Sequence, residues 1–280
     1  MRPNWPRITL VIAIGVLIAG LVWGAAVIWS SMTRQPLPLD DQCRASVDGA
    51  VVTLTPEQAR NATLIGAVGL RRGLPARAVT IALATAYQES GIRNLDYGHA
   101  DSIGLFQQRP SKGWGTVKQI MDPLYSSGQF YTALVKVKGW RSGDINNVAQ
   151  AVQRSGHPNA YRKHVSKAIV LSTSLTGAEP GSFTCKIGSP SGADPKALAA
   201  QLRAALKGQL DVAVTENGLM VNAGSDAVAW MAANLAVAHA GEYGVSRVSV
   251  GGADWTHDPR GLAEWRGMGD GQVVSVEFSR

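Results

Sequence analysis

The sequence predicts a mainly α protein in which a single N-terminal transmembrane helix precedes a helical domain and then a small α/β domain. Three observations lead to this fold class. Residues 8–29 are apolar and carry no charge, and apolar residues recur with the period of α-helices from residue 56 to residue 175. After residue 210 the period shortens to that of strands. At 280 residues, the chain is long enough for two domains of ordinary size.

The N-terminal apolar segment, residues 8–29, has the length of a membrane span. As a helix it would reach about 33 Å, enough to cross the hydrocarbon core. Arg2 and Arg7 precede it, which predicts a cytoplasmic tail over residues 1–7 and the body of the protein outside the cytoplasm. A cleaved signal peptide is the alternative, but the apolar run is long for one and no small-residue cleavage site follows it. We therefore expect a retained single-pass anchor in the cell membrane, with a short linker over residues 30–42.

Two cysteines, Cys43 and Cys185, bracket the region that follows the linker. Outside the cytoplasm such a pair is expected to oxidise, and two separate buried thiols are the alternative. A disulfide between them would close a loop of roughly 140 residues and stabilise the fold by up to about 4–5 kcal/mol on the chain-entropy account. We expect the disulfide, and with it a domain over residues 43–188.

The helical domain consists of segments that begin at a capping residue and end at glycine. Thr55-Pro56 illustrates the pattern, because threonine caps helices and proline fits the first helical position. The second helix ends at Glu89-Ser90-Gly91 and has almost no polar face, so we expect it at the domain centre. The predicted helices are 56–72, 75–90, 117–121, 123–138, 145–155 and 158–175, with one possible strand at 50–54.

The C-terminal part, residues 194–280, changes to an α/β pattern after a Gly/Ser/Pro-containing linker over residues 189–193. A helix from Asp194 to about Leu206 precedes a hairpin around the Asn217-Gly218 turn. A second helix covers about 226–239, and the segments 247–250 and 272–278 have the alternation of strands. The sequence does not choose among packing, wall binding and a partner in the cell envelope as the role of this domain.

Charge is distributed unevenly along the chain. Residues 43–188 carry 17 Lys and Arg residues against 8 Asp and Glu residues, whereas residues 189–280 carry 7 against 10. Outside a cell, the natural anionic partners of a basic domain are wall polymers and lipid head groups. Nucleic acid would need a cytoplasmic face, which the predicted topology denies, so no nucleic-acid partner is expected.

Glu89 is the first candidate for chemistry, because it ends an apolar helix. The partial negative charge of a helix C-terminus and removal from water both favour the protonated form of a carboxyl group. A carboxylic acid that keeps its proton near neutral pH can protonate a glycosidic oxygen. An ordinary surface glutamate at a frayed helix end is the alternative that position alone favours.

The segment after Glu89 carries a second motif. Glu89-Ser90, a polar loop and then a Gly-Leu-Phe-Gln run from Gly104 to Gln107 resemble the signature of lytic transglycosylases and goose-type lysozymes, with Phe106 in place of the usual Met. The resemblance implies that Glu89 is the acid and then the base, that Ser90 orients it, and that Gln107 lies along the saccharide. It also implies close approach of the backbone at Gly104.

The same resemblance implies a lysozyme-like fold for residues 43–188, of the membrane-anchored kind common in actinobacterial envelopes. Gln108 and Tyr161 are further candidates for the substrate groove, although a core role for Tyr161 is equally compatible with the sequence. The Ala-Tyr-Asn segment typical of transglycosylases is not plainly present, and the segments 149–154 and Ala160-Tyr161 stand where it might be. Asp101 faces the groove in one interpretation and forms a turn in the other.

Mechanism depends on a second carboxylate. An inverting hydrolase needs one to activate water and a retaining hydrolase needs a nucleophile, and Asp96 or Asp101 would have to supply it. A transglycosylase needs neither, because a hydroxyl of the substrate closes the ring. Trp114 and Tyr97 could stack on sugar rings or simply pack. Arg93, Arg109 and Lys112 could meet peptide carboxylates or form a solvated basic face.

These observations predict cleavage of the β-1,4 glycosidic bond of peptidoglycan, with glycan strands as partner and the N-terminal helix in the membrane. The alternative is a non-catalytic glycan-binding or scaffolding protein of an envelope complex. Histidine, cysteine and carboxylate residues do not stand at metal-ligand spacing, so we expect neither a metal nor a cofactor.

Overall fold

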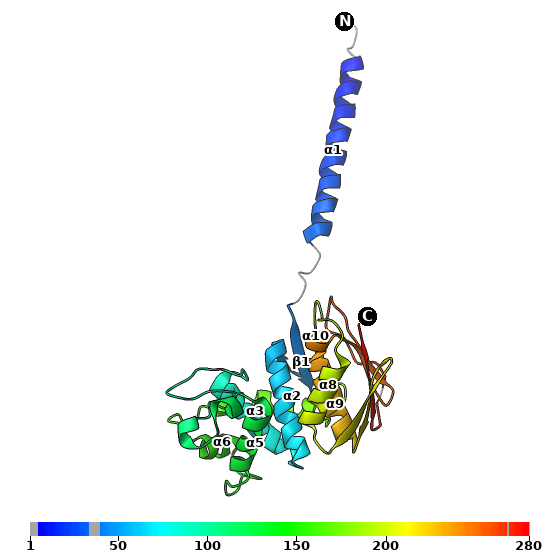
Figure 1. Ribbon diagram of the computed structural model, residues 1–280. Coiled ribbons are helices and arrows are strands. Elements are labelled where there is room, and N and C mark those ends of the chain that lie inside the picture. The colour runs from blue at the N-terminus through cyan, green and yellow to red at the C-terminus, as the bar shows by residue number, and fades with distance from the viewer. Residues whose placement is uncertain (1–4, 34–39, 268, 280) are drawn as a thin grey trace. The chain divides into compact units, whose positions relative to one another are not determined.

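The computed structural model describes residues 5–33, 40–267 and 269–279, and the chain forms two compact units, Met1–Pro38 and Leu39–Arg280 (Figure 1). The first unit contains helix α1 (Trp5–Thr33). Every other helix and strand described below belongs to the second unit.

The predicted transmembrane span over residues 8–29 is not supported. Within the part of the chain that the structure describes, no helix is long and apolar enough to cross a membrane. A span needs about 20 consecutive apolar residues, and the side chains of α1 are described only over residues 14–27 and at Trp29. Residues 1–4 of the predicted cytoplasmic tail and residues 34–39 of the predicted linker lie outside the described residues.

The predicted mainly α fold class is wrong, because the second unit contains two antiparallel sheets. The first has the strand order β2-β1-β3 and is formed by β1 (Gln42–Val47), β2 (Ala50–Leu54) and β3 (Phe183–Lys186). Strands of four to six residues give little periodicity, and β3 pairs with a strand that lies far away in the sequence. The possible strand predicted at 50–54 is β2, but local pattern could not reveal the pairing that makes it part of a sheet.

The predicted disulfide is confirmed. Cys43 of β1 and Cys185 of β3 face each other across the sheet, with their Cα atoms 3.9 Å apart and 142 residues between them in sequence. Both cysteines are fully buried. The bond therefore joins the two ends of the region that carries the cleft described below.

Six helices of the described chain lie between these strands: α2 (Pro56–Arg71), α3 (Ala76–Ser90), α4 (Val117–Ile120), α5 (Pro123–Leu134), α6 (Ile145–Gln153) and α7 (Val165–Leu175). Thr55 caps α2, as the sequence predicts, and the structure adds a reciprocal capping box with Gln58. Helix α3 packs against α2, α5, α6 and α7 and is buried over most of its length, which confirms its central position. It ends at Gly91 in the left-handed conformation (φ 66°).

Two helices are shorter than predicted. Helix α5 ends at Leu134 rather than near residue 138, and the turn that follows leads to Trp140, which returns to the core. Helix α7 begins only at Val165, after a turn and the short 3₁₀ helix η2 (Arg162–His164). A second short 3₁₀ helix, η1 (Pro110–Lys112), precedes α4. The turns after α5 and before α7 carry residues of the candidate site.

The C-terminal part forms a five-stranded antiparallel sheet in the order β4-β5-β8-β6-β7. Its elements are α8 (Pro195–Ala205), β4 (Leu210–Thr215), β5 (Gly218–Ala223), α9 (Asp226–Ala238), α10 (Ala240–Tyr243), β6 (Val245–Val250), β7 (Ala253–Thr256) and β8 (Val273–Phe278). The hairpin predicted at Asn217-Gly218 is β4–β5. Helices α8, α9 and α10 pack against the sheet (Figure 1).

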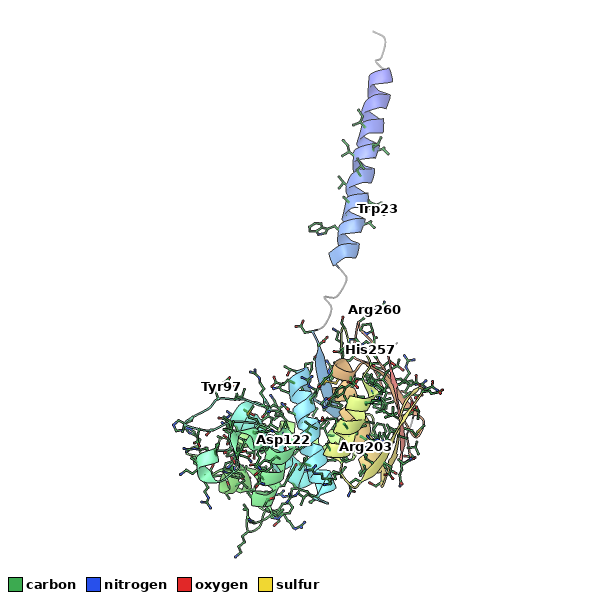
Figure 2. All side chains as sticks on the ribbon, viewed as in Figure 1. Trp23, Tyr97, Asp122, Arg203, His257 and Arg260 are labelled. Atoms are coloured by element: carbon green, nitrogen blue, oxygen red, sulfur yellow. A yellow bond between two sulfur atoms is a disulfide. The ribbon has the colours of Figure 1, made fainter. Side chains whose placement is uncertain are left out.

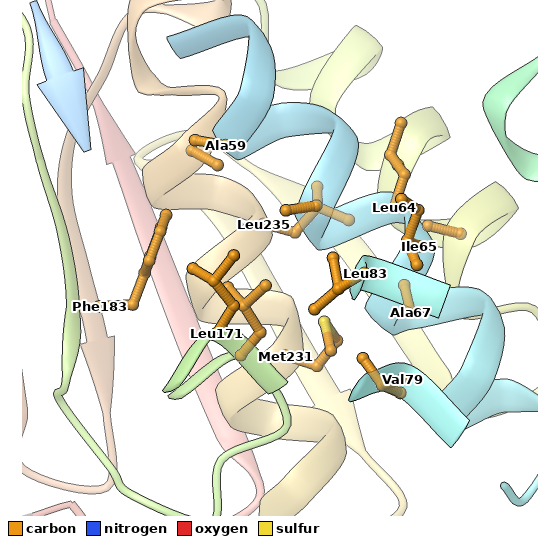
Figure 3. Packing of buried hydrophobic residues seen from close by; sticks show 14 of the residues in the cluster. Ala59, Leu64, Ile65, Ala67, Val79, Leu83, Leu171, Phe183, Met231 and Leu235 are labelled. Atoms are coloured by element: carbon orange, nitrogen blue, oxygen red, sulfur yellow. The ribbon is translucent and has the colours of Figure 1, made fainter. Parts of the chain in front are cut away.

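One hydrophobic core joins the helical part to the C-terminal part. Met231 and Leu235 of α9 lie among Ile65 of α2, Leu83 of α3 and Leu171 of α7, and all five are fully buried (Figure 3). Helix α2 approaches α9 most closely at a glycine, since a Cβ atom at Gly66 would lie 2.8 Å from the Met231 Cε atom. The predicted linker over residues 189–193 thus connects two parts of a single compact unit.

Candidate functional site

A cleft of about 1270 Å³ is lined by residues between Gln88 and His157. Its walls come from the end of α3, the loop from residue 99 to residue 114, helix α5 with the turn after it, and the end of α6. Sites for small ligands usually enclose about 300–1000 Å³. The volume therefore suits an extended ligand, such as a run of several sugar rings.

Glu89 lines this cleft at the C-terminal end of α3. The Tyr161 hydroxyl donates a hydrogen bond of 2.7 Å to Glu89 Oε1. Burial raises the pKa of the Glu89 carboxyl, while hydrogen bonds from Tyr161 and Gln153 oppose that rise. The net shift is upward, so the site favours a carboxyl group that keeps its proton to higher pH than an ordinary glutamate does.

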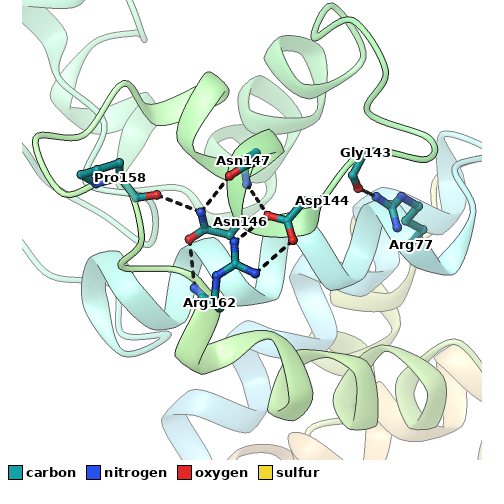
Figure 4. A network of polar contacts seen from close by, with 7 residues as sticks. All are labelled: Arg77, Gly143, Asp144, Asn146, Asn147, Pro158 and Arg162. Carbon is teal, nitrogen blue, oxygen red and sulfur yellow. Dashed lines mark hydrogen bonds and ion pairs between the residues drawn. The ribbon is translucent and has the colours of Figure 1, made fainter.

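A polar network fixes the segment that carries Tyr161 (Figure 4). The buried Asn146 amide donates to the Pro158 carbonyl at 2.8 Å and accepts from the Arg162 backbone N–H at 3.1 Å. The Arg162 guanidinium pairs with both carboxylate oxygens of Asp144, each at 3.2 Å. These contacts attach residues 158–162 to the start of α6 and leave Tyr161 fully buried beside Glu89.

Ser90 has a different partner from the predicted one. Its hydroxyl donates to the Leu105 carbonyl at 2.8 Å and accepts from the Arg93 backbone N–H at 3.2 Å. Ile103 and Gln108 form an isolated antiparallel bridge that closes the turn containing Leu105. Ser90 thus attaches the Gly-Leu-Phe-Gln turn to the end of α3, next to Glu89.

Gln107 lines the cleft, as predicted for a residue along the substrate. It adopts a left-handed conformation (φ 48°), and its side-chain amide donates to the Tyr97 carbonyl at 3.2 Å. Gly104 is required by the protein itself, because it has φ 77° and a Cβ atom there would lie 2.9 Å from the Ile120 carbonyl oxygen of α4. The close approach at Gly104 is therefore to a neighbouring helix.

Three predicted groove residues, Gln108, Asp101 and Tyr161, do not line the cleft, and Tyr161 is fully buried. The Gln108 side chain is only 1% exposed and donates to the Ser126 carbonyl at 3.1 Å. Asp101 accepts from the Ser111 backbone N–H at 2.8 Å and pairs with Arg109 at 2.6 Å. These contacts, the Ser111 N–H first, hold the pKa of the Asp101 carboxyl well below its usual range, so Asp101 organises the loop as an anion.

The remaining predicted candidates also divide into residues that line the cleft and residues that do not. Trp114 and Lys112 line the cleft, whereas the exposed Tyr97 does not and lies at the outer edge of its loop (Figure 2). Asp96 is exposed and is also absent from the lining. Arg93 pairs with Glu57 at 3.3 Å away from the cleft. Among the described residues that line the cleft, Glu89 is thus the one carboxylate.

Sequence reasoning missed Gln153, which donates to the Phe106 carbonyl at 2.8 Å and contacts Glu89. It follows the buried Ala149 by four residues on α6, so helical spacing could have placed it on the inner face. It also missed three lining cations, Lys136, Lys138 and Arg154. No local signal marks these, because their convergence depends on how α5 and α6 pack.

The described parts of the chain contain no group of three or more histidine, cysteine or carboxylate residues that could hold a metal ion. The chemistry that this arrangement offers is proton transfer by one carboxyl group in a long cationic cleft. Neither a protein-family model nor a curated protein matches the chain. The functional assignment therefore depends on the residues and their geometry.

Proposed function

We propose that the protein cleaves the β-1,4 glycosidic bond of peptidoglycan next to muramic acid, with Glu89 as acid and then as base. One observation carries the proposal: Glu89 has a raised pKa and is the one carboxylate among the described lining residues of a cleft large enough for several sugar rings. A raised carboxyl pKa is what a general acid for a glycosidic oxygen requires.

In the proposed reaction Glu89 gives one proton to the leaving oxygen and later receives a different proton from a hydroxyl of the substrate. Tyr161 donates to Oε1, which leaves Oε2 to carry the proton. As the bond between C1 and the leaving oxygen breaks, that oxygen keeps the electron pair and takes the Glu89 proton. The muramoyl 6-hydroxyl oxygen then bonds to C1 and gives its proton to the Glu89 carboxylate. The product is a 1,6-anhydro sugar, and no water is consumed.

The surroundings of Glu89 favour this route over hydrolysis. A hydrolase of the two-carboxylate type needs a second acidic residue at about 5–9.5 Å from the first. Asp101 is occupied by Ser111 and Arg109, and Asp96 lies outside the described lining of the cleft. When a hydroxyl of the substrate itself attacks C1, neither aspartate is needed.

The disulfide supports a compartment outside the cytoplasm as part of the proposal. Bonds such as Cys43–Cys185 form and persist in oxidising surroundings outside the cytoplasm, which is also where peptidoglycan lies. We therefore place the body of the protein, residues 40–279, on the outer side of the cell membrane as part of the same proposal.

Digestion of purified peptidoglycan by the purified protein, with products analysed by mass spectrometry, tests the proposal. We expect anhydromuropeptides from the wild type and a loss of about 10²-fold or more for Glu89→Gln, the typical contribution of a general acid. Glu179→Gln, at an exposed glutamate outside the cleft, is the matched control and should be fully active.

Two other outcomes would contradict the proposal. Products with reducing ends would indicate a hydrolase. Tight binding of glycan without any product, unchanged in Glu89→Gln, would instead support the non-catalytic glycan-binding or scaffolding alternative.

A further inference from the structure

Five cations from three separate segments line the cleft: Arg109, Lys112, Lys136, Lys138 and Arg154. Asp101 neutralises only the first of them, through the ion pair to Arg109. The other four, called the cation rim below, form no ion pair with any residue that the structure describes. A cleft with this lining carries a positive potential that Glu89 alone cannot balance.

Arg154 shows that the rim is retained against a conformational cost. It ends α6 in the left-handed conformation (φ 53°), where glycine or asparagine is the common choice. Its backbone N–H bonds to the Gln150 carbonyl at 2.7 Å, but its guanidinium has no hydrogen-bond or ion-pair partner in the described parts of the protein. A strained residue with an unpartnered cation at the edge of a cleft indicates that the side chain acts on a ligand.

The rim also differs from a solvated basic face in its geometry. Lys136 and Lys138 lie in the turn after α5, Lys112 lies in η1, and Arg154 follows α6. Chain segments that are distant in sequence thus bring like charges to one concave surface. Low-dielectric walls concentrate the field of such charges and raise the local concentration of an anionic ligand.

We propose that the cation rim binds carboxylates on the peptide branches of the glycan strand, so that the protein selects strands with charged peptides over uncharged strands. This inference rests on the proposed function and names its preferred substrate. The sugar rings themselves are neutral, so they do not complement the positive charge of the rim, whereas carboxylates do. Peptide branches leave the strand at muramic acid, which places their carboxylates beside the bond that faces Glu89.

Equilibrium binding of soluble peptidoglycan fragments to the Glu89→Gln protein tests the inference without turnover. The two ligands are native fragments and the same fragments with their carboxylates converted to amides by carbodiimide and ammonia. One exposed ion pair is worth at most about a fivefold change in affinity. Because the rim holds more than one cation, we expect native fragments to bind about tenfold more tightly than amidated fragments. The difference should disappear near 1 M salt, where exposed charges are screened beyond about 3 Å.

The triple variant Lys136→Gln/Lys138→Gln/Arg154→Gln should lose most of that preference and should bind amidated fragments as the unmodified rim does. These side chains are exposed, so the variant is expected to fold, and circular dichroism verifies this. Equal affinity of the unmodified rim for native and amidated fragments would overturn the inference.

A charge-matched control, Lys196→Gln/Lys207→Gln/Arg260→Gln, removes two lysines and one arginine from exposed positions outside the cleft. This control variant should keep the preference for native fragments. Loss of that preference in the control variant would show that net charge alone is responsible. Tighter binding of a phosphate-rich wall polymer than of native fragments would also overturn the inference.

The two proposals fail separately. If wild-type protein cleaves native and amidated strands at equal rates, the catalytic proposal survives and the role of the rim does not. If the protein cleaves neither strand but binds native fragments preferentially through the rim, the role of the rim survives and catalysis by Glu89 does not.

Discussion

The cleft-bearing part, residues 40–188, and the C-terminal sheet part, residues 189–279, use backbone conformation differently. In the first, Gln107 and Arg154 adopt left-handed conformations on the lining of the cleft, and Ile92, Ala100 and Asp48 do so elsewhere in that part. In the described residues of the second, only glycines adopt them. Strain is thus confined to the part where loops must bring polar side chains together, as expected of a functional site.

The two parts also balance their charges differently. On the C-terminal sheet, Arg247 pairs with Asp254 at 3.0 Å and with Glu277 at 3.8 Å. In the cleft, Lys136, Lys138 and Arg154 have no anionic partner among the described residues. The comparison teaches that, within one compact unit with a shared core, the cleft-bearing part gathers cations without an ion-pair partner in the described chain on one concave surface, where they can act on a ligand.

Removal of the disulfide should have the largest effect on the stability of the two parts. Cys43→Ser/Cys185→Ser is expected to lower the free energy of unfolding by about 2–5 kcal/mol, because it releases the closure of a long loop. Chemical denaturation measured by circular dichroism gives the value, with wild type under reductant as the parallel sample. Because the two parts share one core, we expect a single transition, and two separate transitions would show that they unfold independently.

Met231 tests the shared core directly. Met231→Ala should cost about 2–5 kcal/mol, since it leaves a cavity between α9 and α2. The control is Met220→Ala at a methionine that is 38% exposed on the sheet, where the cost should stay below about 1 kcal/mol. Urea denaturation measures both, and similar costs at the two positions would contradict the packing of α9 on α2.

Tyr161 should set the pH range of the cleft. Its hydroxyl stabilises the Glu89 carboxylate, so Tyr161→Phe removes an interaction that lowers the pKa of Glu89. The alkaline limb of cleavage should therefore move to higher pH, by about one unit or less for one lost hydrogen bond. The pH dependence of kcat/KM measures the shift, and movement to lower pH would contradict the assigned direction.

The Glu89→Gln substitution should show the smallest effect on stability, and the size of that effect depends on pH. Burial raises the pKa of Glu89 in the folded state, so its contribution is complete below the unfolded-state pKa and is lost as pH rises through the folded-state pKa. The glutamine in Glu89→Gln does not titrate, so we expect stability equal to that of wild type near pH 4 and a higher Tm than wild type near pH 8. Differential scanning calorimetry at both pH values measures this difference.

The elements that the sequence predicts correctly depend on neighbouring residues. The Thr55 cap, the stop at Gly91 and the Asn217-Gly218 hairpin each act within four residues of chain, and the sequence alone located them. Glu89 at the end of an apolar helix was located in the same way. The pairing of the two cysteines was predicted from their even number and the expected compartment, although 142 residues separate them.

Only the tertiary structure decided what surrounds Glu89. Tyr161 reaches it from 72 residues away, β3 joins β1 across most of the chain, and the cation rim gathers from three segments. The physical reason is the separation along the chain between the groups that interact. Caps and turns are satisfied by the nearest backbone groups, whereas the burial of Glu89, its hydrogen bonds and its electrostatic surroundings exist only after helices distant in sequence have packed.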